Sequence, residues 1–317
     1  MSIGKSPHTA LRLLLLWSAA LPLAHADWWQ DCASERQRFC QDTPAGEGRV
    51  AACIDAHAPQ LSAQCRAARP GGSAAVPERS AGQSQSQSQS QSQSFHSLYR
   101  TQFAGGIDRS LMLQQPRADA IGTAPAPCTP RQDALRISIR QGDNYKGVAN
   151  GVPRAEINFA PRFRFQPGHE YRIRWSTCLP TDYRFDSQQP EGITQIHGEA
   201  AQGSPPFGLS LVQGRYEVQL RDGNRVQTRD LGSAAADRGR WVHWTLRYRP
   251  DHRGPQAITE LEKDDAPLLA ANGQANAYPD DSGAYFKIGI YKWWWQSRPS
   301  DVTERTVYFG DVEVDLR

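Results

Sequence analysis

From about residue 95 onward, hydrophobic and polar residues alternate in many short segments of the chain. Alternation with a period of two is typical of strands that have one buried face and one exposed face. No stretch of this region has the longer periodicity of an extended amphipathic helix. The segments that we expect to form strands are Ala134–Arg140, Glu170–Trp175, Gly208–Val212, Tyr216–Leu220, Trp241–Tyr248, Tyr285–Trp295 and Thr306–Asp315.

Turn-forming residues separate these segments, and Arg221-Asp222-Gly223-Asn224 has the composition of a hairpin turn. Many short strands joined by turns predict an antiparallel sandwich. A span of roughly 220 residues suits a two-sheet jelly roll better than an immunoglobulin-like sandwich of about 100 residues. We therefore expect an all-β domain, a two-sheet β-jelly roll, over residues 97–317.

The beginning of the chain has the features of a secretory signal peptide. Lys5 and Arg12 precede the apolar run Leu13–Leu23, which ends in an Ala-His-Ala sequence at residues 24–26. This order predicts a leader, residues 1–26, that is cleaved before Asp27. Because the run is shorter than the ~20 residues of a membrane span, we expect a secreted or periplasmic protein without a transmembrane segment.

The six cysteines predict three disulfides in such an oxidising compartment. Cys128 and Cys178 lie far from the rest, and we expect them to pair with each other. The pairing among the other four stays open, and these are Cys32, Cys40, Cys53 and Cys65. A C-x-x-C spacing, which zinc and redox sites use, is absent.

Residues 27–69 form a first unit, in which segments 31–39 and 50–57 have helical composition. The pattern DCASERQRFC…GEGRVAACIDAHAPQLSAQCRAA resembles the cysteine-rich repeat first described in a Golgi glycoprotein. The resemblance implies a small helical module held by disulfides, with a structural or binding role. Residues 70–96, which include Gln-Ser dipeptides from residue 83 to residue 94, predict a disordered linker between this module and the β domain.

Two short motifs carry polar groups that we expect on one face of a strand. In the first, Arg154 and Glu156 project together, while Ala155 and Ile157 face the core. The second is Gln-Ile-His-Gly-Glu at residues 195–199. Its glutamine, histidine and glutamate share a face, and Ile196 is buried on the other.

The third motif is the aromatic segment Tyr285–Trp295. As a single strand, it places aromatic and polar residues that suit the stacking of sugar rings on one face. Gly289 in its middle leaves room for a closely approaching ligand. The expected open face holds Tyr285, Lys287, Gly289, Tyr291, Trp293 and Trp295. The expected core face holds Phe286, Ile288, Ile290 and Trp294, interrupted by Lys292.

Taken in order, R-x-E, Q-I-H and Y-F-K-x-G-x-Y resemble the signatures of jelly-roll polysaccharide lyases. They are similar to alginate lyases and to the heparin-lyase-I-like and glucuronan lyase groups. The resemblance implies a concanavalin-A-like jelly roll whose concave sheet holds the substrate. The chain departs from the alginate signature at Asn158, which replaces a second basic residue, and at Trp293, which replaces a glutamine. These two departures leave open whether its substrate is alginate or another polysaccharide.

Cleavage of a uronate polymer by β-elimination requires three tasks. The C6 carboxylate must be neutralised, and the candidates are Arg154 and Gln195. A base must remove the C5 proton, and we expect His197 to do so. An acid must protonate the leaving O4, and we assign this role to Tyr291, with Tyr285 as the alternative.

The remaining motif residues are expected to support these steps. Because tyrosine has an ordinary pKa near ~10, we expect Lys287 or Arg154 to lower it. Glu156 is expected to orient Arg154. The predicted substrate-binding residues are Glu156, Tyr285, Lys287, Trp293 and Trp295.

Two other functions remain open at this stage. A non-catalytic, lectin-like module would use the same aromatic face, although it needs no proton-transfer pair. A glycoside hydrolase needs two carboxylates across the bond. We expect Glu260-Leu261-Glu262 and Asp264-Asp265 to lie in a solvated, turn-rich region, where they would not serve.

The net charge of +3 is too small to indicate a nucleic-acid partner. Arginine strongly outnumbers lysine, and its planar guanidinium binds carboxylates bidentately. We expect an acidic polysaccharide as the partner of a monomeric protein. No cofactor or metal is expected, and a structural calcium ion would leave no trace in this sequence.

Overall fold

The computed structural model describes most of the chain beyond the predicted leader. The predicted cleavage site at Asp27 and residues 70–93 of the predicted linker lie outside the described residues. The described residues are 32–40, 43, 49–68, 94–129, 133–198, 203–222, 225–279 and 281–317.

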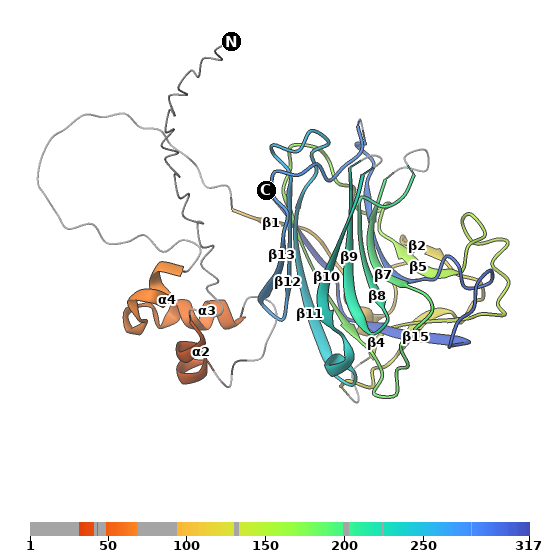
Figure 1. The fold of residues 1–317 in the computed structure, drawn as a ribbon, viewed down its shortest axis with the longest axis horizontal. Coiled ribbons are helices and arrows are strands. Elements are labelled where there is room, and N and C mark those ends of the chain that lie inside the picture. Colours follow the sequence, from red (N-terminus) through yellow and green to blue (C-terminus); the bar gives the residue numbers. More distant parts are fainter. Residues whose placement is uncertain are drawn as a thin grey trace, which may run out of the picture.

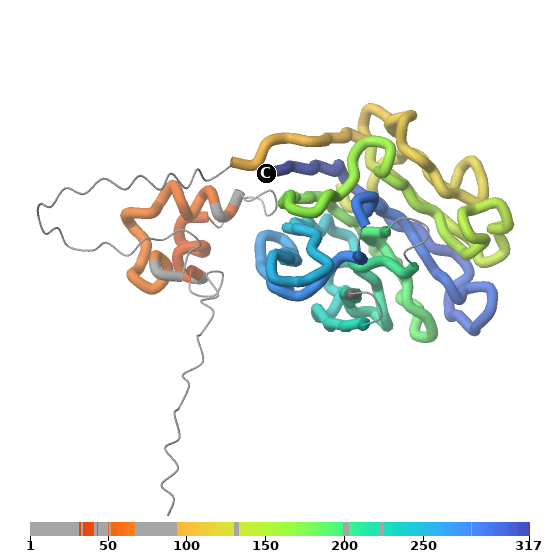
Figure 2. The backbone as a smooth tube through the Cα atoms, turned by 90° about the horizontal axis from the view of Figure 1, so that it is seen from above, coloured from red at the N-terminus to blue at the C-terminus, as the bar shows by residue number. Residues whose placement is uncertain are grey.

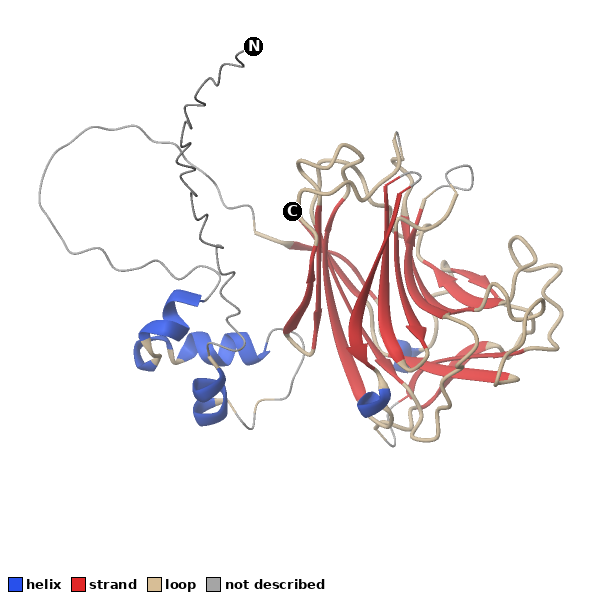
Figure 3. Ribbon diagram, in the orientation of Figure 1, coloured by secondary structure: helices blue, strands red, loops and turns tan. Residues whose placement is uncertain are grey.

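Two antiparallel sheets packed face to face form the larger part of the described structure, as Figure 1 and Figure 3 show. The larger sheet has the order β13 (Ala266–Ala270), β12 (Ile258–Lys263), β11 (Trp241–Arg249), β6 (Tyr171–Cys178), β15 (Glu304–Phe309), β4 (Asp133–Arg140) and β3 (Ile121–Pro125). In the same sheet, β16 (Glu313–Leu316) pairs with β6 and with β1 (His96–Arg100). The smaller sheet has the order β10 (Arg225–Ser233), β9 (Arg215–Asp222), β8 (Phe207–Val212), β7 (Glu191–His197), β14 (Tyr285–Tyr291), β5 (Arg154–Asn158) and β2 (Met112–Gln114). The predicted two-sheet jelly roll is confirmed.

Strand β11 shows how the sequence produces the core. Its buried residues alternate with partly exposed ones, and Val242, Trp244, Leu246 and Tyr248 point inward. Full burial of one such side chain contributes about 1.5–3 kcal/mol relative to its exposure. Inward-facing side chains from both sheets join one hydrophobic cluster, so the open face of the smaller sheet is left for polar groups.

The first and last strands of the domain are neighbours. Strand β1 pairs with β16, with His96 opposite Leu316, and Figure 2 shows the two segments side by side. Because β1 begins at His96, the sheet starts one residue before the predicted domain boundary.

Two of the predicted strands have different bounds. The segment Thr306–Asp315 forms two strands, β15 and β16, because the chain leaves the ladder at Gly310 between them. The segment Tyr285–Trp295 is a strand only as far as Tyr291, after which the chain turns. Alternation continues in the sequence beyond the point at which the backbone leaves the sheet.

The N-terminal unit is helical, as predicted, and has its own small cluster of buried residues. Its elements are α2 (Ala33–Phe39), α3 (Arg49–Ala56), the 3₁₀ turn η1 (Ala58–Gln60) and α4 (Ala63–Ala68). The predicted disulfides are present, as Cys32–Cys65 and Cys40–Cys53 in this unit and Cys128–Cys178 in the β domain. The other described 3₁₀ turns are η2 (Phe103–Gly105) and η4 (Ala235–Asp237).

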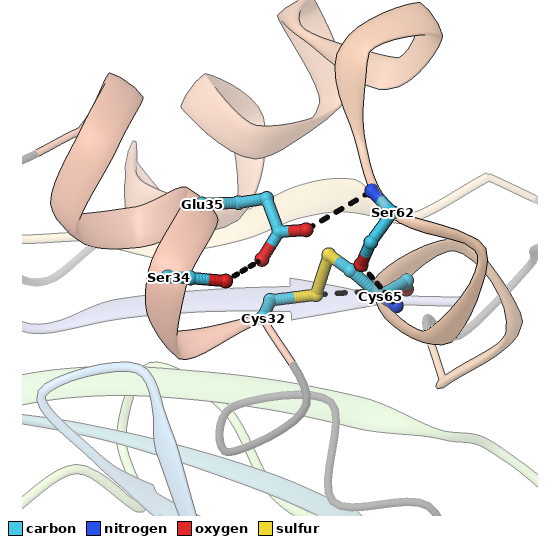
Figure 4. Close-up of a disulfide and its surroundings, with 5 residues drawn as sticks. All are labelled: Cys32, Ser34, Glu35, Ser62 and Cys65. Carbon is cyan, nitrogen blue, oxygen red and sulfur yellow. Dashed lines mark hydrogen bonds between the residues drawn. A yellow bond between two sulfur atoms is a disulfide. The ribbon is translucent and has the colours of Figure 1, made fainter.

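Glu35 links the ends of the helical unit beside one disulfide, as Figure 4 shows. Its carboxylate accepts hydrogen bonds from the Ser62 backbone N–H at 3.0 Å and the Ser34 hydroxyl at 2.7 Å. Hydrogen bonds from Ser62 and Ser34 lower the pKa of Glu35 to about 2. The carboxylate therefore stays ionised and holds α2 to the start of α4. None of the described helices is long and apolar enough to cross a membrane.

Candidate active site

Most of the predicted site residues come together on the outer face of the smaller sheet, where β5, β14 and β7 are adjacent. The register places Lys287 opposite Gln195, Tyr291 opposite Arg154 and Tyr285 opposite His197. Since side chains alternate along each strand, these groups share one face. As predicted, Ala155, Ile157 and Ile196 point into the core. Glu199 lies outside the described residues.

A cluster of charged groups lies beneath this face, with Glu156 at its centre. Its Oε2 accepts hydrogen bonds from Lys287 Nζ at 2.5 Å and from Arg154 Nη1 at 3.2 Å. Its Oε1 accepts a hydrogen bond from the Gln195 amide. Glu156 is 2% exposed and Lys287 is 1% exposed, so neither offers much surface to a ligand. We call Arg154, Glu156, Gln195 and Lys287 the buried cluster.

The buried cluster combines two basic side chains with one carboxylate. Burial lowers the pKa of Lys287, and the charge of Glu156 offsets part of this effect. When Lys287 and Arg154 are both protonated, the cluster has an excess of positive charge. The Gln195 Oε1 atom is buried and has no hydrogen-bond partner among the described residues. These properties suit a site that receives an anionic, hydroxyl-rich ligand.

Arg154 is held by more partners than the sequence indicated. Besides Glu156, its Nη2 donates to Asn150 Oδ1 at 2.7 Å and its Nε donates to the Val152 carbonyl at 3.3 Å. Its guanidinium carbon lies 4.1 Å from the centre of the Tyr291 ring. Asn150 was not predicted because it lies in the turn before β5, where no periodicity marks it.

His197 has one ring nitrogen engaged. Its Nδ1 lies 2.6 Å from the Gly198 carbonyl oxygen. Because a carbonyl only accepts hydrogen bonds, Nδ1 carries the proton and Nε2 has a free lone pair. Burial lowers the pKa of His197 from its ordinary value, so the ring is neutral near pH 7. The ring also stacks on Tyr285, with 5.6 Å between the centroids.

The two tyrosines differ from expectation in their ionisation. Burial raises the pKa of Tyr291, although the charge of Arg154 acts against it. Burial also raises the pKa of Tyr285. The predicted lowering by Arg154 is present, but the cost of burying a phenolate is larger, so the net shift of each tyrosine pKa is upward. Both phenols remain protonated at neutral pH, which suits an acid.

Gly289 is required for a reason other than the predicted one. A Cβ atom at this position would collide with the Ala155 carbonyl oxygen and with Glu156 Cα on the neighbouring strand. The backbone φ of +149° is also rare for residues that have a side chain. The close approach is therefore made by β5 rather than by a ligand.

The structure corrects the predicted faces of the tryptophans. Because the strand ends at Tyr291, Trp295 turns into the core, where it is 0% exposed and its Nε1 donates to the Val302 carbonyl at 3.0 Å. The prediction that Trp295 contacts substrate was wrong. Trp294, predicted to face the core, is 37% exposed. Trp293 remains beside Tyr291, with 5.2 Å between the ring centroids.

The family is decided by comparison with known proteins. The family model described as polysaccharide lyase matches residues 89–313. The chain belongs to the polysaccharide lyase family. Its enzyme class is therefore polysaccharide lyase, as the resemblance implied.

The comparison with solved structures gives one that shares the fold of this lyase and others with lower scores. An endo-β-1,4-glucuronan lyase from the fungus Trichoderma reesei aligns over 69% of this chain and 95% of its own, with 16% identity and a TM-score of 0.56. An alginate lyase from Pseudomonas aeruginosa aligns over 65% and 97%, with 15% identity and a TM-score of 0.46. The comparison with curated protein sequences gives no match.

The acidic residues that we considered for a hydrolase lie away from the buried cluster. Glu260 and Glu262 lie on β12 of the larger sheet, and the expectation of a turn holds only for Asp264 and Asp265. Burial and the nearby Asp265 raise the pKa of Glu262 to about 7. This perturbed carboxyl is on the other sheet from the buried cluster and is not one of a pair across it.

Among the described residues, one group has three potential metal ligands close together, Cys40, Cys53 and His57. Its two sulfur atoms are joined in a disulfide and offer no thiolate to a metal ion. This group therefore does not fit a structural zinc ion.

Proposed function

We propose that this lyase cleaves a uronic-acid-containing polysaccharide by β-elimination on the open face of the smaller sheet. The observation that supports this most strongly is the buried cluster beside a neutral imidazole with a free Nε2. The name of the Trichoderma reesei relative, a glucuronan lyase, also supports a uronate substrate. The products would have 4,5-unsaturated uronate ends.

The first step is neutralisation of the C6 carboxylate. The Arg154 guanidinium has five N–H groups. Three hydrogen bonds from it go to Val152, Glu156 and Asn150, so N–H donors remain for the substrate. Gln195 keeps a second amide hydrogen for the sugar. Donors aimed at the carboxylate stabilise the negative charge that develops when C5 loses its proton.

In the second step, His197 Nε2 removes the C5 proton and becomes protonated. The electron pair of the C5–H bond forms the C4=C5 double bond, and the C4–O4 bond breaks. Tyr291 donates its phenolic proton to the leaving oxygen. The nearby Arg154 charge stabilises the phenolate that remains, until a proton returns from His197 through solvent.

Two tyrosines compete for the acid role. Tyr285 is stacked on His197, whereas Tyr291 lies at the Arg154 end of the buried cluster and is not in direct contact with the histidine. We assign the acid to Tyr291, because a cation adjacent to its ring stabilises its conjugate base and because it matches the final tyrosine of the motif. The stacking of Tyr285 on His197 supports Tyr285 as the alternative acid.

The deciding experiment measures unsaturated product by ultraviolet absorbance with alginate, glucuronan and glycosaminoglycans. Tyr291→Phe and His197→Gln should each lower kcat by ~10²- to 10⁴-fold with little change in KM, since each removes a proton-transfer group. Tyr285→Phe is the matched control and should retain most activity. A collapse in Tyr285→Phe with a normal Tyr291→Phe would move the acid role, and the absence of product from every substrate would refute the proposed function.

We also propose that the protein is exported. Disulfides persist in oxidising compartments, and three are present in the described residues.

A further inference from the structure

The loop that follows β14 carries an aromatic surface that the proposed mechanism does not use. Tyr291 and Trp293 are in ring contact, and Trp293 in turn meets Trp294 edge to face, with 5.6 Å between the centroids. The Arg298 guanidinium covers one face of Trp294, 3.7 Å from the ring centre. The contacts therefore run without a break from the catalytic tyrosine to an arginine on the rim.

The Trp293 ring packs beside Gly192 of β7, at ordinary van der Waals distance from the position of a Cβ atom there. Gly192 on β7 lies opposite Tyr291, and a Cβ atom on it would sit 3.8 Å from the Trp293 ring. The indole thus covers the outer face of the smaller sheet next to the buried cluster. Trp293 extends the catalytic face rather than forming a separate patch.

Buried polar groups fix this loop in place. Lys292 is 0% exposed, and its Nζ donates to Asp186 Oδ2 at 2.7 Å. The same oxygen accepts from the Ser300 hydroxyl at 2.6 Å. From the same β6–β7 loop as Asp186, Gln189 Nε2 donates to the carbonyls of Arg298 at 2.8 Å and of Pro299 at 2.5 Å. The exposed Trp294 and Arg298 are therefore held on a rigid support.

The guanidinium of Arg298 keeps its charge available. It forms no hydrogen bond or ion pair with a carboxylate in the part of the chain that the structure describes. The one acidic side chain of the loop, Asp301, instead accepts a hydrogen bond from the Ser187 backbone N–H at 2.8 Å. An unpaired arginine on an anchored aromatic surface is suited to an anionic ring.

We propose that Trp293, Trp294 and Arg298 form an additional subsite at the rim of the open face, which binds a uronate residue of the polymer that lies beyond the three sugars nearest to the cleaved bond. The indoles contact the apolar face of the sugar ring, and Arg298 donates hydrogen bonds to its carboxylate. This inference rests on the proposed uronate substrate and goes beyond it, because it adds a binding position outside the reacting sugar. A rigid loop loses little conformational entropy on binding, so its contacts are available for affinity.

The test uses the full-length protein with β-1,4-linked oligoglucuronates and oligoalginates of three and six residues. For whichever series is cleaved, Arg298→Ala and Trp294→Ala should lower kcat/KM on the hexamer about five- to tenfold. Each should leave the trimer within about twofold, because a short substrate that spans the catalytic groups does not reach the loop. Arg136→Ala, on the outer face of the larger sheet, makes the same charge change and should have no effect on either length.

A binding assay separates this subsite from the proposed reaction. Calorimetry with the six-residue uronates should show about five- to tenfold weaker binding for Arg298→Ala. The carboxyl-reduced hexamer should bind wild type and Arg298→Ala equally. If wild type yields no unsaturated product but shows these differences, the proposed function fails and the subsite stands. Equal losses on trimer and hexamer, no loss on either, or an equal loss with the carboxyl-reduced hexamer would each overturn the subsite.

Circular dichroism and melting temperature check that each variant is folded. Trp294→Phe keeps an aromatic ring at the position and should recover more than half of the hexamer affinity that Trp294→Ala loses. A Trp294→Phe variant as weak as Trp294→Ala, with both fully folded, would also count against ring stacking.

Discussion

At the scale of single residues, the environment of His197 decides which of its nitrogens does chemistry. The Gly198 carbonyl holds the proton on Nδ1, and burial disfavours the imidazolium. Both effects leave Nε2 as an unprotonated base at neutral pH. Tyr291 and Tyr285 have the opposite property, because burial keeps their protons on. Burial thus keeps His197 unprotonated, as a base needs, and keeps the tyrosines protonated, as an acid needs, on one face of the sheet.

The pH dependence of activity follows from the direction of the His197 shift. Protonation of the base inactivates the enzyme, and a lowered pKa means that more acid is needed to protonate it. The acidic limb of kcat/KM should therefore be half-maximal below pH 6.5, the ordinary value for histidine. A profile of initial rates from pH 4 to pH 9 measures this. A midpoint above pH 6.5 would contradict the assignment, and His197→Gln should remove the limb from the residual activity.

At the scale of elements, alternation in the sequence predicted which segments are strands but not where each one ends. The pattern of Trp241–Tyr248 matches β11 because every alternate residue finds the core. The pattern of Tyr285–Trp295 continues for four residues past the end of β14. The reversal depends on Lys292 finding Asp186, which lies 106 positions earlier in the chain. The residues around Lys292 in the sequence do not indicate which distant residue it will contact.

The roles of the charged motif residues were foreseen only in part for a similar reason. Spacing placed Arg154, Gln195 and Lys287 each on the polar face of its own strand, and the register brings these three faces together. Their convergence on Glu156 depends on three strands that are separated in the sequence. Spacing within one strand gives the face of a side chain but not its partners on the neighbouring strands.

The Lys292–Asp186 pair gives a prediction at this scale. Lys292→Met leaves Asp186 buried without its cation and should destabilise the β domain by about 3–5 kcal/mol. Adding Asp186→Asn removes the uncompensated charge, so the double variant should be more stable than the single one. Urea unfolding followed by tryptophan fluorescence measures both. If Lys292→Met unfolds at the wild-type denaturant concentration, the pair does not hold the loop.

At the scale of the whole molecule, the helical unit and the β domain have separate hydrophobic clusters. Two of the disulfides lie within the first unit, and the third lies within the second. No described disulfide joins the two units. These observations support the predicted division of the chain, whose boundaries remain a prediction.

A fragment that begins at Ser94 tests this division. It keeps β1 and the Cys128–Cys178 disulfide, so it should fold and retain kcat/KM on soluble substrate within about twofold of the full chain. Gel filtration and the ultraviolet assay provide the measurements. An aggregated or inactive fragment would show that the helical unit is part of the catalytic fold.

The pairing of β1 with β16 also determines when the domain can finish folding. Strand β16 lies between β1 and β6, so the larger sheet is incomplete until residues 313–316 are present. In the chain, residues 313–316 follow every other strand of this domain that the structure describes, and contacts of such long sequence separation form slowly. The larger sheet therefore cannot be completed before residues 313–316 have been made, so the proposed export could begin while the domain is still unfolded.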